Sequence, residues 1–503
     1  MNLITEDRSL PRLAWIARYE TTNQHLEIHY GRDVEVGDFF LVEGVWDGAY
    51  SDIGYNKSNH FFGSGLKILN DEVIVVPSTG LVDRIFIGES KEHYYISNSL
   101  IEILARTKSE LIQSHNYRVQ TDTIRDGIKN YINDYPISSE VLLNLKQYFY
   151  HPIKINGKTL SISKRPKSPD FESYEQYIST IDSDLKNIAL NASSPLRRKT
   201  IDFYTTISKG YDSTAVTALA ADLPIKYAFT SKISNSSLLN LFIKDWNDDD
   251  GTKIAQKLGL PIIYLDFEES EIDSDELYFL AATAGEPELQ LFKMHKFLAK
   301  NDSPSAIFTG YHGDTIWGLS PPNRALTDDI LKPGASGLTL SEARLKSGFI
   351  DIPVPMMHAR SIVSINRISA SDEMSKWAVG GDYDRPIPRR ILESLGIDRN
   401  EFGMKKRAVA TFYDLPKNKT LREEFLCYMA FVYNKSARSI IMNQFKDQFK
   451  YYSRMLLYTL DQLTLKTGRF ERPLNSHTID TPYFMHIWSL TKLVRERVKE
   501  LDS

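Results

Sequence analysis

Hydrophobic and polar positions follow two patterns along the chain, and the first extends to about residue 160. In it, short apolar runs are separated by Gly, Asp, Asn and Ser, which favour turns between strands. The clearest of these runs lie at 38–42, 73–76, 85–87 and 94–96. The pattern predicts a sheet-rich α+β region.

A polar stretch at 163–170 contains two prolines and predicts a linker or an exposed loop. A helix is expected from about Phe171, and the segment 191–195 (Asn-Ala-Ser-Ser-Pro) predicts its end. We therefore divide the chain into a first domain at 1–165 and a second at 166–503.

From about residue 200 the pattern changes to strands that alternate with helices. Strands are predicted at 201–207, 225–230, 262–265 and 306–309. The acidic run 248–251 predicts a helix start, and Gly259 predicts the end of that helix. Such alternation predicts a parallel sheet in a doubly wound α/β domain, and the pattern beyond about residue 385 is mostly helical.

Composition narrows the class of protein. The 503 residues are 42% hydrophobic and 25% charged, which is typical of a globular protein, and the net charge of −4 does not favour nucleic acid as a partner. The single cysteine, Cys427, excludes an internal disulfide and cysteine-based zinc sites. The N-terminus does not resemble a signal peptide, and no apolar run approaches the length of a membrane span. We expect a cytoplasmic protein with no membrane partner.

The segment 208–214 (Ser-Lys-Gly-Tyr-Asp-Ser-Thr) lies between a predicted strand and a predicted helix. This arrangement directs backbone N–H groups and a helix N-terminus toward one point, and both attract an anion. Gly210 allows a close approach of the backbone, and Asp212 can hold a magnesium ion. Hydroxyl groups are offered by Ser208, Ser213 and Thr214. The alternative is a polar turn that only caps a helix.

This segment is not a Walker loop, because the Gly-x-x-x-x-Gly-Lys-Ser/Thr pattern is absent. It resembles the PP-loop of ATP pyrophosphatases, Ser-Gly-Gly-x-Asp-Ser, with Lys209 in place of the first glycine and Tyr211 at the variable position. The resemblance implies that the loop grips the pyrophosphate that leaves when AMP is transferred. Lys209 would either add a phosphate contact or point to solvent.

A second segment, 309–318 (Thr-Gly-Tyr-His-Gly-Asp-Thr-Ile-Trp-Gly), follows the strand predicted at 306–309. It resembles the asparagine-synthetase family, and within it the Gly-Tyr-Gly-x-Asp form of β-lactam and carbapenam synthetases. The resemblance implies that Asp314 is a second magnesium ligand beside Asp212, and that Gly310 belongs to the nucleotide-binding segment. Two carboxylates suit Mg²⁺, which prefers oxygen ligands.

The same resemblance places Tyr311 where those cyclising synthetases use a tyrosine, together with a glutamate, to deprotonate the amine nucleophile. Glu342 lies in about the right region to be that glutamate, and an exposed helix residue is the alternative. His312 beside a glycine is interpreted as structural or substrate-lining.

A third segment, 402–408 (Phe-Gly-Met-Lys-Lys-Arg-Ala), resembles the Lys-Lys-x-Gly stretch of the family. The resemblance implies that Lys406, or as second choice Lys405, stabilises the adenylation and acyl-transfer transition states. A basic surface loop is the alternative. The three segments occur in the family's order, which supports the resemblance more than any one of them.

The first domain resembles the glutaminase domain of asparagine synthetases at 76–87 and 94–100. That domain uses a cysteine after Met1 as its nucleophile, but Asn2 occupies this position and Cys427 is far away. Glutamine hydrolysis by a thiolate is therefore not expected. The resemblance implies a degenerate domain of the N-terminal-nucleophile type.

Together these segments predict an ATP-dependent, AMP-forming amide-bond synthetase of the asparagine-synthetase type, similar to β-lactam synthetases and lasso-peptide cyclases. It would use ATP and Mg²⁺ to adenylate a small-molecule or peptide carboxylate, and an amine donor would then form the amide by cyclisation or by amidation. A homo-oligomer is left open. The alternatives are a PP-loop enzyme acting on another carbonyl or a nucleobase, and an inactive family member with a binding or structural role.

Overall fold

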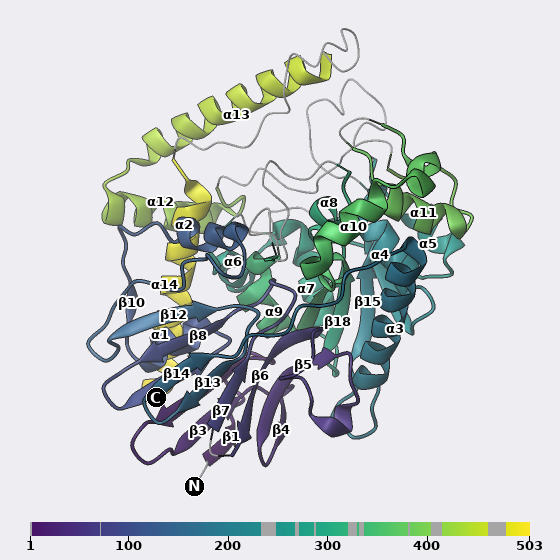
Figure 1. Cartoon of the computed structure of the whole chain (residues 1–503). Coiled ribbons are helices and arrows are strands. Elements are labelled where there is room, and N and C mark those ends of the chain that lie inside the picture. Colours follow the sequence, from purple (N-terminus) through teal and green to yellow (C-terminus); the bar gives the residue numbers. More distant parts are fainter. Residues whose placement is uncertain are drawn as a thin grey trace.

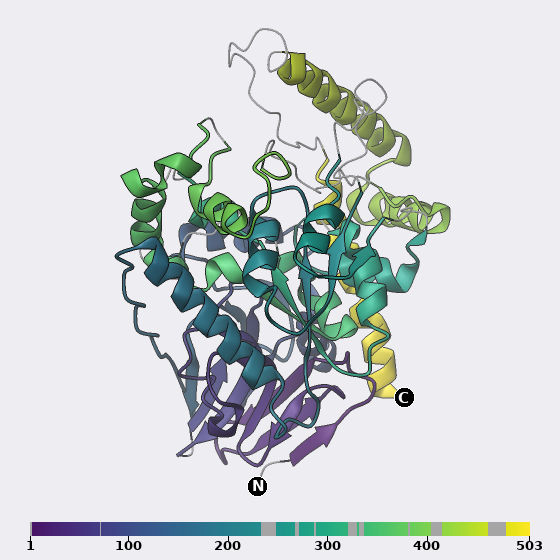
Figure 2. The ribbon, with the colours of Figure 1, turned by 90° about the vertical axis from the view of Figure 1, so that its right-hand side faces the viewer.

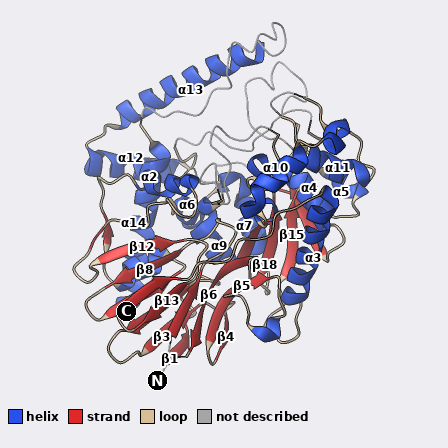
Figure 3. Cartoon of the chain, in the orientation of Figure 1, coloured by secondary structure: helices blue, strands red, loops and turns tan. Residues whose placement is uncertain are grey.

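A computed structural model of the chain has a mixed α/β architecture (Figure 1). It describes residues 3–70, 72–232, 248–266, 271–285, 288–319, 329–330, 337–380, 383–403, 415–460 and 479–503. Within these ranges the strands form two six-stranded sheets, one five-stranded parallel sheet and one two-stranded sheet (Figure 3).

The two six-stranded sheets are formed by the N-terminal part of the chain. The first has the order β1-β3-β2-β9-β8-β12, with β1 Leu3–Glu6, β2 Trp15–Glu20, β3 Leu26–Tyr30, β8 Ile85–Glu89, β9 His93–Ser97 and β12 Asn144–Tyr148. The second has the order β14-β13-β7-β6-β5-β4, with β4 Glu35–Gly37, β5 Phe40–Trp46, β6 Phe61–Leu69, β7 Glu72–Val76, β13 Ile153–Asn156 and β14 Thr159–Ile162. Side chains alternate between the two faces of a strand, so each sheet offers one apolar face. The two sheets share one core, in which Trp15 and Ile28 of the first meet Leu66 and Val75 of the second.

The five-stranded sheet has the order β17-β16-β15-β18-β19, and all neighbouring strands are parallel. Its strands are β15 Asp202–Thr206, β16 Ile225–Thr230, β17 Ile262–Tyr264, β18 Ser305–Thr309 and β19 Phe349–Pro353. The chain runs outward from β15 to one edge and then returns to the other side of β15 with β18. The order of the strands therefore reverses between β15 and β18, where open α/β sheets bind ligands.

Both faces of this sheet are covered. Phe203 and Phe308 point into a core shared with the helices α3, α4, α10 and α11. Their sequence neighbours Tyr204 and Ile307 point to the opposite face, where Met294 of α7 packs. The helices around the sheets are α1 Leu100–Arg106, α2 Tyr117–Asp122, α3 Tyr174–Ala192, α4 Asp212–Ala220, α5 Thr252–Lys257, α6 Ser274–Ala281, α7 Phe292–Leu298, α8 Gly313–Ile316, α9 Ser341–Ser347, α10 Ile362–Ser369, α11 Pro386–Ser394, α12 Lys419–Tyr433, α13 Ala437–Leu460 and α14 Thr481–Asp502.

Two parts of the molecule lie outside this layered arrangement. The two-stranded sheet pairs β10 Glu110–Leu111 with β11 Ile137–Ser138. Helix α13 extends beyond the rest of the ribbon, as the two views in Figures 1 and 2 agree. In the described part of the chain, no helix is long and apolar enough to cross a membrane.

The segment at 163–170 is irregular, as its prolines predict, but it is not simply exposed. Arg165 is 5% exposed, and its guanidinium donates hydrogen bonds to the backbone carbonyls of Tyr150 and Ser58. The prediction of an exposed loop is wrong at this residue, because hydrogen bonds to His151, Tyr150 and Ser58, which lie in loops beside the N-terminal sheets, hold it in place.

Candidate functional site

The two predicted ATP-binding segments follow neighbouring parallel strands. Residue Thr205 of β15 is paired with Phe308 of β18, so both strands end at the same edge of the sheet. The loop at 207–211 leads from β15 into α4, and Gly310 to His312 lead from β18 into α8. These segments, about one hundred residues apart in the sequence, therefore meet where the strand order reverses.

The loop after β15 is held by its own hydroxyl groups. Ser208 Oγ accepts a hydrogen bond of 3.0 Å from the N–H of Gly210 and lies 2.9 Å from Ser213 Oγ. Thr214 Oγ1 donates a 2.7 Å hydrogen bond to the Ser208 carbonyl. All three predicted hydroxyl residues thus lie in one turn at the start of α4, which preshapes the loop.

Two glycines allow the segments after β15 and β18 to touch. A Cβ atom at Gly310 would lie 2.5 Å from the backbone nitrogen of Ser213, and one at Gly313 would lie 2.6 Å from Cγ of Asp212. Both distances are shorter than a Cβ atom can tolerate, so each position requires glycine. The close approach brings Asp212 against the first turn of α8, which carries Asp314.

Arg385, just before α11, pairs with one predicted magnesium ligand, Asp212, and lies within electrostatic range of the other, Asp314. Its guanidinium forms an ion pair with both carboxylate oxygens of Asp212. Burial alone would lower the pKa of Arg385. The charge of Asp212 and, to a smaller extent, that of Asp314 raise this pKa above its usual value. The Arg385 side chain is buried, whereas Asp314 is exposed. The site therefore contains two carboxylates, Asp212 and the exposed Asp314, and one positively charged side chain, Arg385.

Lys209 does not simply point to solvent, and the phosphate contact expected as the other possibility stays a prediction. Its Nζ forms an ion pair with Asp248, and its backbone N–H donates a 3.0 Å hydrogen bond to Asp249 Oδ1. The acidic run at 248–251 thus has two tasks, because Asp250 also supports the start of α5 by accepting a 2.9 Å hydrogen bond from the N–H of Thr252, the first residue of that helix. The sequence predicted only the second task.

Tyr211 anchors the loop at 207–211 in the protein core. Its ring is buried and packs on Tyr383 and Phe402, and its hydroxyl accepts a hydrogen bond from Arg389. Gly403 has φ +64°, and a Cβ atom there would lie 2.3 Å from the Tyr211 ring. The N–H of Gly403 donates a 2.8 Å hydrogen bond to the carbonyl of the loop residue at 209.

The third predicted segment is only partly described. Residues 402 and 403 reach the loop as above, but Lys406 and its second choice Lys405 lie outside the described residues. The role predicted for Lys406 stays a prediction.

Tyr311 forms a pair with a glutamate that the sequence did not single out. Its hydroxyl donates a hydrogen bond to Glu288 Oε2. The other oxygen, Oε1, accepts bonds of 2.9 Å from Gly337 N–H and 2.7 Å from Thr339 Oγ1. Burial, followed by the charges of Glu288 and Asp351, raises the pKa of Tyr311 well above its usual value. The phenol is therefore neutral, and its hydroxyl proton is directed at a fixed carboxylate.

Glu342 is not brought to Tyr311, and the pairing expected from spacing is replaced by Tyr311–Glu288. Glu342 Oε1 accepts a 2.7 Å bond from Leu100 N–H, and Oε2 accepts a 2.8 Å bond from Ser99 Oγ. The alternative of an exposed helix residue is also wrong, because Glu342 is 2% exposed. Burial raises its pKa to about 7, although both hydrogen bonds act to lower it.

His312 has a structural position, in line with its interpretation. It has φ +63° and stands as the residue before α8, where its backbone conformation turns the chain from β18 into the helix. Its side chain is buried.

Three residues of this site were not singled out from the sequence: Arg385, Glu288 and Tyr383. Arg385 and Tyr383 come from one segment, 380–385 (Gly-Gly-Asp-Tyr-Asp-Arg), which combines glycines with acidic residues and directly precedes the Pro386 that begins α11. That segment was a usable signal, whereas Glu288 lies in a separate part of the chain.

No protein-family model matches this chain, and a search among curated proteins finds no match. The case for a function therefore depends on the geometry of the site and on the motifs in the sequence.

Proposed function

We propose that the chain is an ATP-dependent, AMP-forming amide-bond synthetase. The observation that carries the proposal is the contact between the loop after β15 and the segment after β18, which brings Asp212 against the first turn of α8, at the point where the strand order of the parallel sheet reverses. An anion-binding loop, a helix N-terminus and two carboxylates at one sheet edge suit a triphosphate with its metal ion.

The residues present fit a magnesium ion. Asp212 and Asp314 supply the oxygen ligands that Mg²⁺ prefers, and Gly310 and Gly313 keep the space beside Asp212 free of side-chain carbon. When bound, Mg²⁺ would neutralise charge that develops on the phosphates. The loop at 208–214 would hold the β- and γ-phosphates through its N–H and hydroxyl groups.

Arg385 gives this site a specific first step. A carboxylate oxygen of the substrate would attack the α-phosphorus of ATP, and the bond to the β-phosphate would break, which yields an acyl-adenylate and pyrophosphate. The guanidinium of Arg385 lies where it could leave Asp212 and pair with the departing pyrophosphate. Such charge stabilisation in a partly buried site is the kind that contributes most to catalysis.

The second step would use the acidic group around Tyr311. An amine nitrogen would attack the acyl carbon, AMP would leave, and the amine would lose a proton. Tyr311 could accept this proton while it passes its own to Glu288, which is held by three donors. The charges of Glu288 and Asp351, both of which act on Tyr311, also suit an ammonium group that arrives before deprotonation.

The test is ATP–pyrophosphate exchange on the full chain with panels of carboxylic acids, together with calorimetry of ATP binding with Mg²⁺. We expect exchange with at least one class of acid, and a loss of about 100-fold in the Asp212→Asn variant. Asp202→Asn is the matched control, because Asp202 lies on the same strand at the opposite edge and pairs with Lys226. Absence of both exchange and nucleotide binding would sink the proposal.

One observation favours a second candidate, a nucleotide-binding protein without catalysis. Arg385 already neutralises Asp212, and Lys209 is paired with Asp248, so internal cations occupy places where the family resemblance predicts a metal ion and phosphates. This candidate requires ATP binding that is indifferent to Mg²⁺ and no exchange with any acid. Calorimetry with and without Mg²⁺ separates the two.

A further inference from the structure

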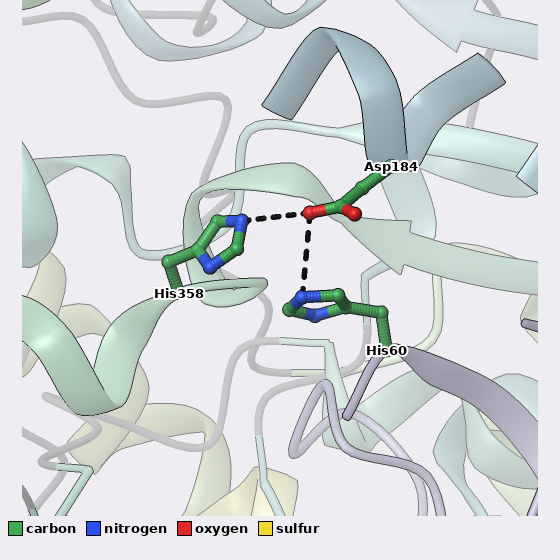
Figure 4. Close-up of side chains that lie close together, drawn as sticks. All are labelled: His60, Asp184 and His358. Carbon is green, nitrogen blue, oxygen red and sulfur yellow. Dashed lines mark hydrogen bonds and ion pairs between the residues drawn. The ribbon is translucent and has the colours of Figure 1, made fainter. Parts of the chain in front are cut away.

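Two histidines and an aspartate meet away from the ATP-binding edge. Nε2 of His60 lies 3.4 Å, and Nε2 of His358 lies 3.0 Å, from the same oxygen, Oδ2 of Asp184. Figure 4 shows both imidazole rings directed at this carboxylate from separate parts of the chain. The three ligand atoms all lie within 4.8 Å of one another.

The distances match those between ligands of one metal ion. A tetrahedral ion with bonds of about 2.1 Å separates its ligand atoms by roughly 3.4 Å. A small outward movement of the two rings would open the space for such an ion. Imidazole nitrogen and carboxylate oxygen are the donors that zinc and its neighbours in the first transition row accept.

The surroundings make a hydrogen-bonded triad an incomplete account of the cluster. The side chains of His60 and His358 are each 5% exposed, and neither Nδ1 makes a hydrogen bond of normal geometry among the described residues. The rings meet edge to face, with centroids 4.5 Å apart. Two buried imidazoles that direct their Nε2 atoms at one carboxylate oxygen share a single acceptor, and an ion bound to both Nε2 atoms and to Asp184 would replace this shared contact.

We propose that His60, Asp184 and His358 form a structural site for a divalent transition-metal ion of the zinc type. The proposal does not rest on the proposed ATP chemistry, because none of the three residues belongs to that site. Asp184 is 16% exposed, which gives an ion a route from solvent. A further carboxylate, Asp47, lies within electrostatic range of His358 and could, like water, complete the coordination.

One nearby charge opposes a cation. Arg165 acts electrostatically on both His60 and Asp47. Its guanidinium is directed at the backbone carbonyls of Ser58 and Tyr150, which take up part of its charge. Because the ligand set has one formal negative charge on Asp184, neutral imidazole donors would have to supply most of the affinity, as they do in other zinc sites.

The position of the cluster gives the ion a mechanical role. His60 precedes β6 in the second six-stranded sheet, Asp184 is in α3, and His358 follows η7 (Val354–Met356) after β19. The turn η7 packs against both α4 and α8, which begin at Asp212 and Gly313. An ion here would tie the N-terminal sheets to the segment that supports both magnesium-binding helices.

The test measures metal content and thermal stability of the full chain. Protein freed of metal is mixed with zinc chloride, passed through gel filtration and analysed for zinc by mass spectrometry. We expect about one zinc per chain in the wild type, and at least about a tenfold loss in Asp184→Asn and His358→Gln. Zinc should raise the unfolding temperature of the wild type by about 5 °C or more, and chelation should reverse the rise.

His295→Gln is the matched control. His295 is also buried, but it lies on α7 and contacts Ser347, so its loss should destabilise the fold without removing the zinc. Since the ligand variants could fail to fold, the visible absorption of Co²⁺ added to the wild-type chain provides a second measurement. Wild-type protein without stoichiometric zinc, without cobalt absorption bands and with an unfolding temperature indifferent to both would overturn the proposal. Zinc retained in full by a folded His358→Gln variant would overturn it as well.

Discussion

Two glutamates, Glu288 and Glu342, lie at similar distances from Tyr311 in the sequence, but they have different hydrogen-bond partners in the structure. Glu288 lies 23 residues before Tyr311 and accepts the phenol proton, whereas Glu342 lies beyond it and caps α1. Spacing alone pointed to Glu342, because the resemblance supplied a glutamate after the tyrosine. Which of the two glutamates reaches Tyr311 depends on which loop folds over the edge of the sheet. No local sequence pattern indicates that choice.

The Tyr311–Glu288 pair should matter for amide formation and not for adenylation. We expect Tyr311→Phe and Glu288→Gln to retain ATP–pyrophosphate exchange within a few-fold, but to lower the rate of amide formation by about 100-fold to 10,000-fold, because a positioned proton acceptor contributes that much. Exchange and product formation are measured on the same preparations.

Glu342→Gln is the comparison for this experiment, since the resemblance assigned Glu342 the same role. Amide formation that falls with Glu342→Gln and survives Glu288→Gln would reverse our assignment of the pair.

The hydroxyl residues Ser208, Ser213 and Thr214 were predictable one by one from the sequence, because they belong to one contiguous loop. Arg385 was not predicted, although its position directly before the Pro386 of α11 offered a local signal, because no sequence pattern pairs it with Asp212.

At the scale of elements, the glycines fix how closely the two ATP-binding segments approach. Four of the five strands of the parallel sheet were predicted within one or two residues, because each is a compact apolar run before a turn. The fifth, β19, was missed, because Asp351 interrupts its apolar run and Pro353 ends it. Asp351 is buried within the sheet and accepts a 2.6 Å hydrogen bond from Thr309, which a reading of hydropathy cannot foresee.

We expect Gly310→Ala to lower ATP–pyrophosphate exchange by at least about tenfold, because the added methyl group would push the backbone of Ser213 away from β18. The effect should appear in KM for ATP as well as in kcat, and the circular dichroism spectrum should be unchanged. Gly54→Ala is the control, since a Cβ atom at Gly54 would have no neighbour within 4 Å. Equal activity of the two variants would show that the close contact of the segments is dispensable.

At the scale of the whole molecule, buried charges join the N-terminal sheets to the rest. Arg344 of α9 is 2% exposed and pairs with Glu43 of β5 and with Asp83. Removing one member of such a buried pair costs much more than the pair contributes, because the partner charge is left without compensation. The two predicted domains are therefore not connected by a linker alone. No local sequence pattern indicates these pairs, which join residues 301 and 261 positions apart.

Glu342 makes this junction sensitive to pH. Its pKa of about 7 in the folded protein exceeds the ordinary glutamate value of 4.5, so the folded state binds the proton more tightly. Between these values the free energy of unfolding must fall as the pH rises. We expect the wild type to lose about 3 kcal/mol relative to Glu342→Gln between pH 4.5 and pH 8.

Denaturant unfolding of the wild type and of Glu342→Gln between pH 4.5 and pH 8 measures this difference. The substitution also alters hydrogen bonds, but that shifts the free energy of unfolding equally at every pH and leaves the pH dependence unchanged. Glu423→Gln on α12 is the control, because the Glu423 side chain is 65% exposed and its loss should leave the pH profile parallel to that of the wild type. Parallel profiles for Glu342→Gln and the wild type would contradict the raised pKa.

Helix α14 packs against α1 and α6, with Trp488 in a core that also contains Leu104. It is tied to the start of the chain by contacts such as Arg497 to Asp7, 490 residues apart. During synthesis on the ribosome, the face of α1 that packs against α14 therefore stays exposed until nearly all of the chain has been made. Cells that synthesise this protein should depend on chaperones that shield apolar surface during translation, and slower elongation should lower the soluble yield.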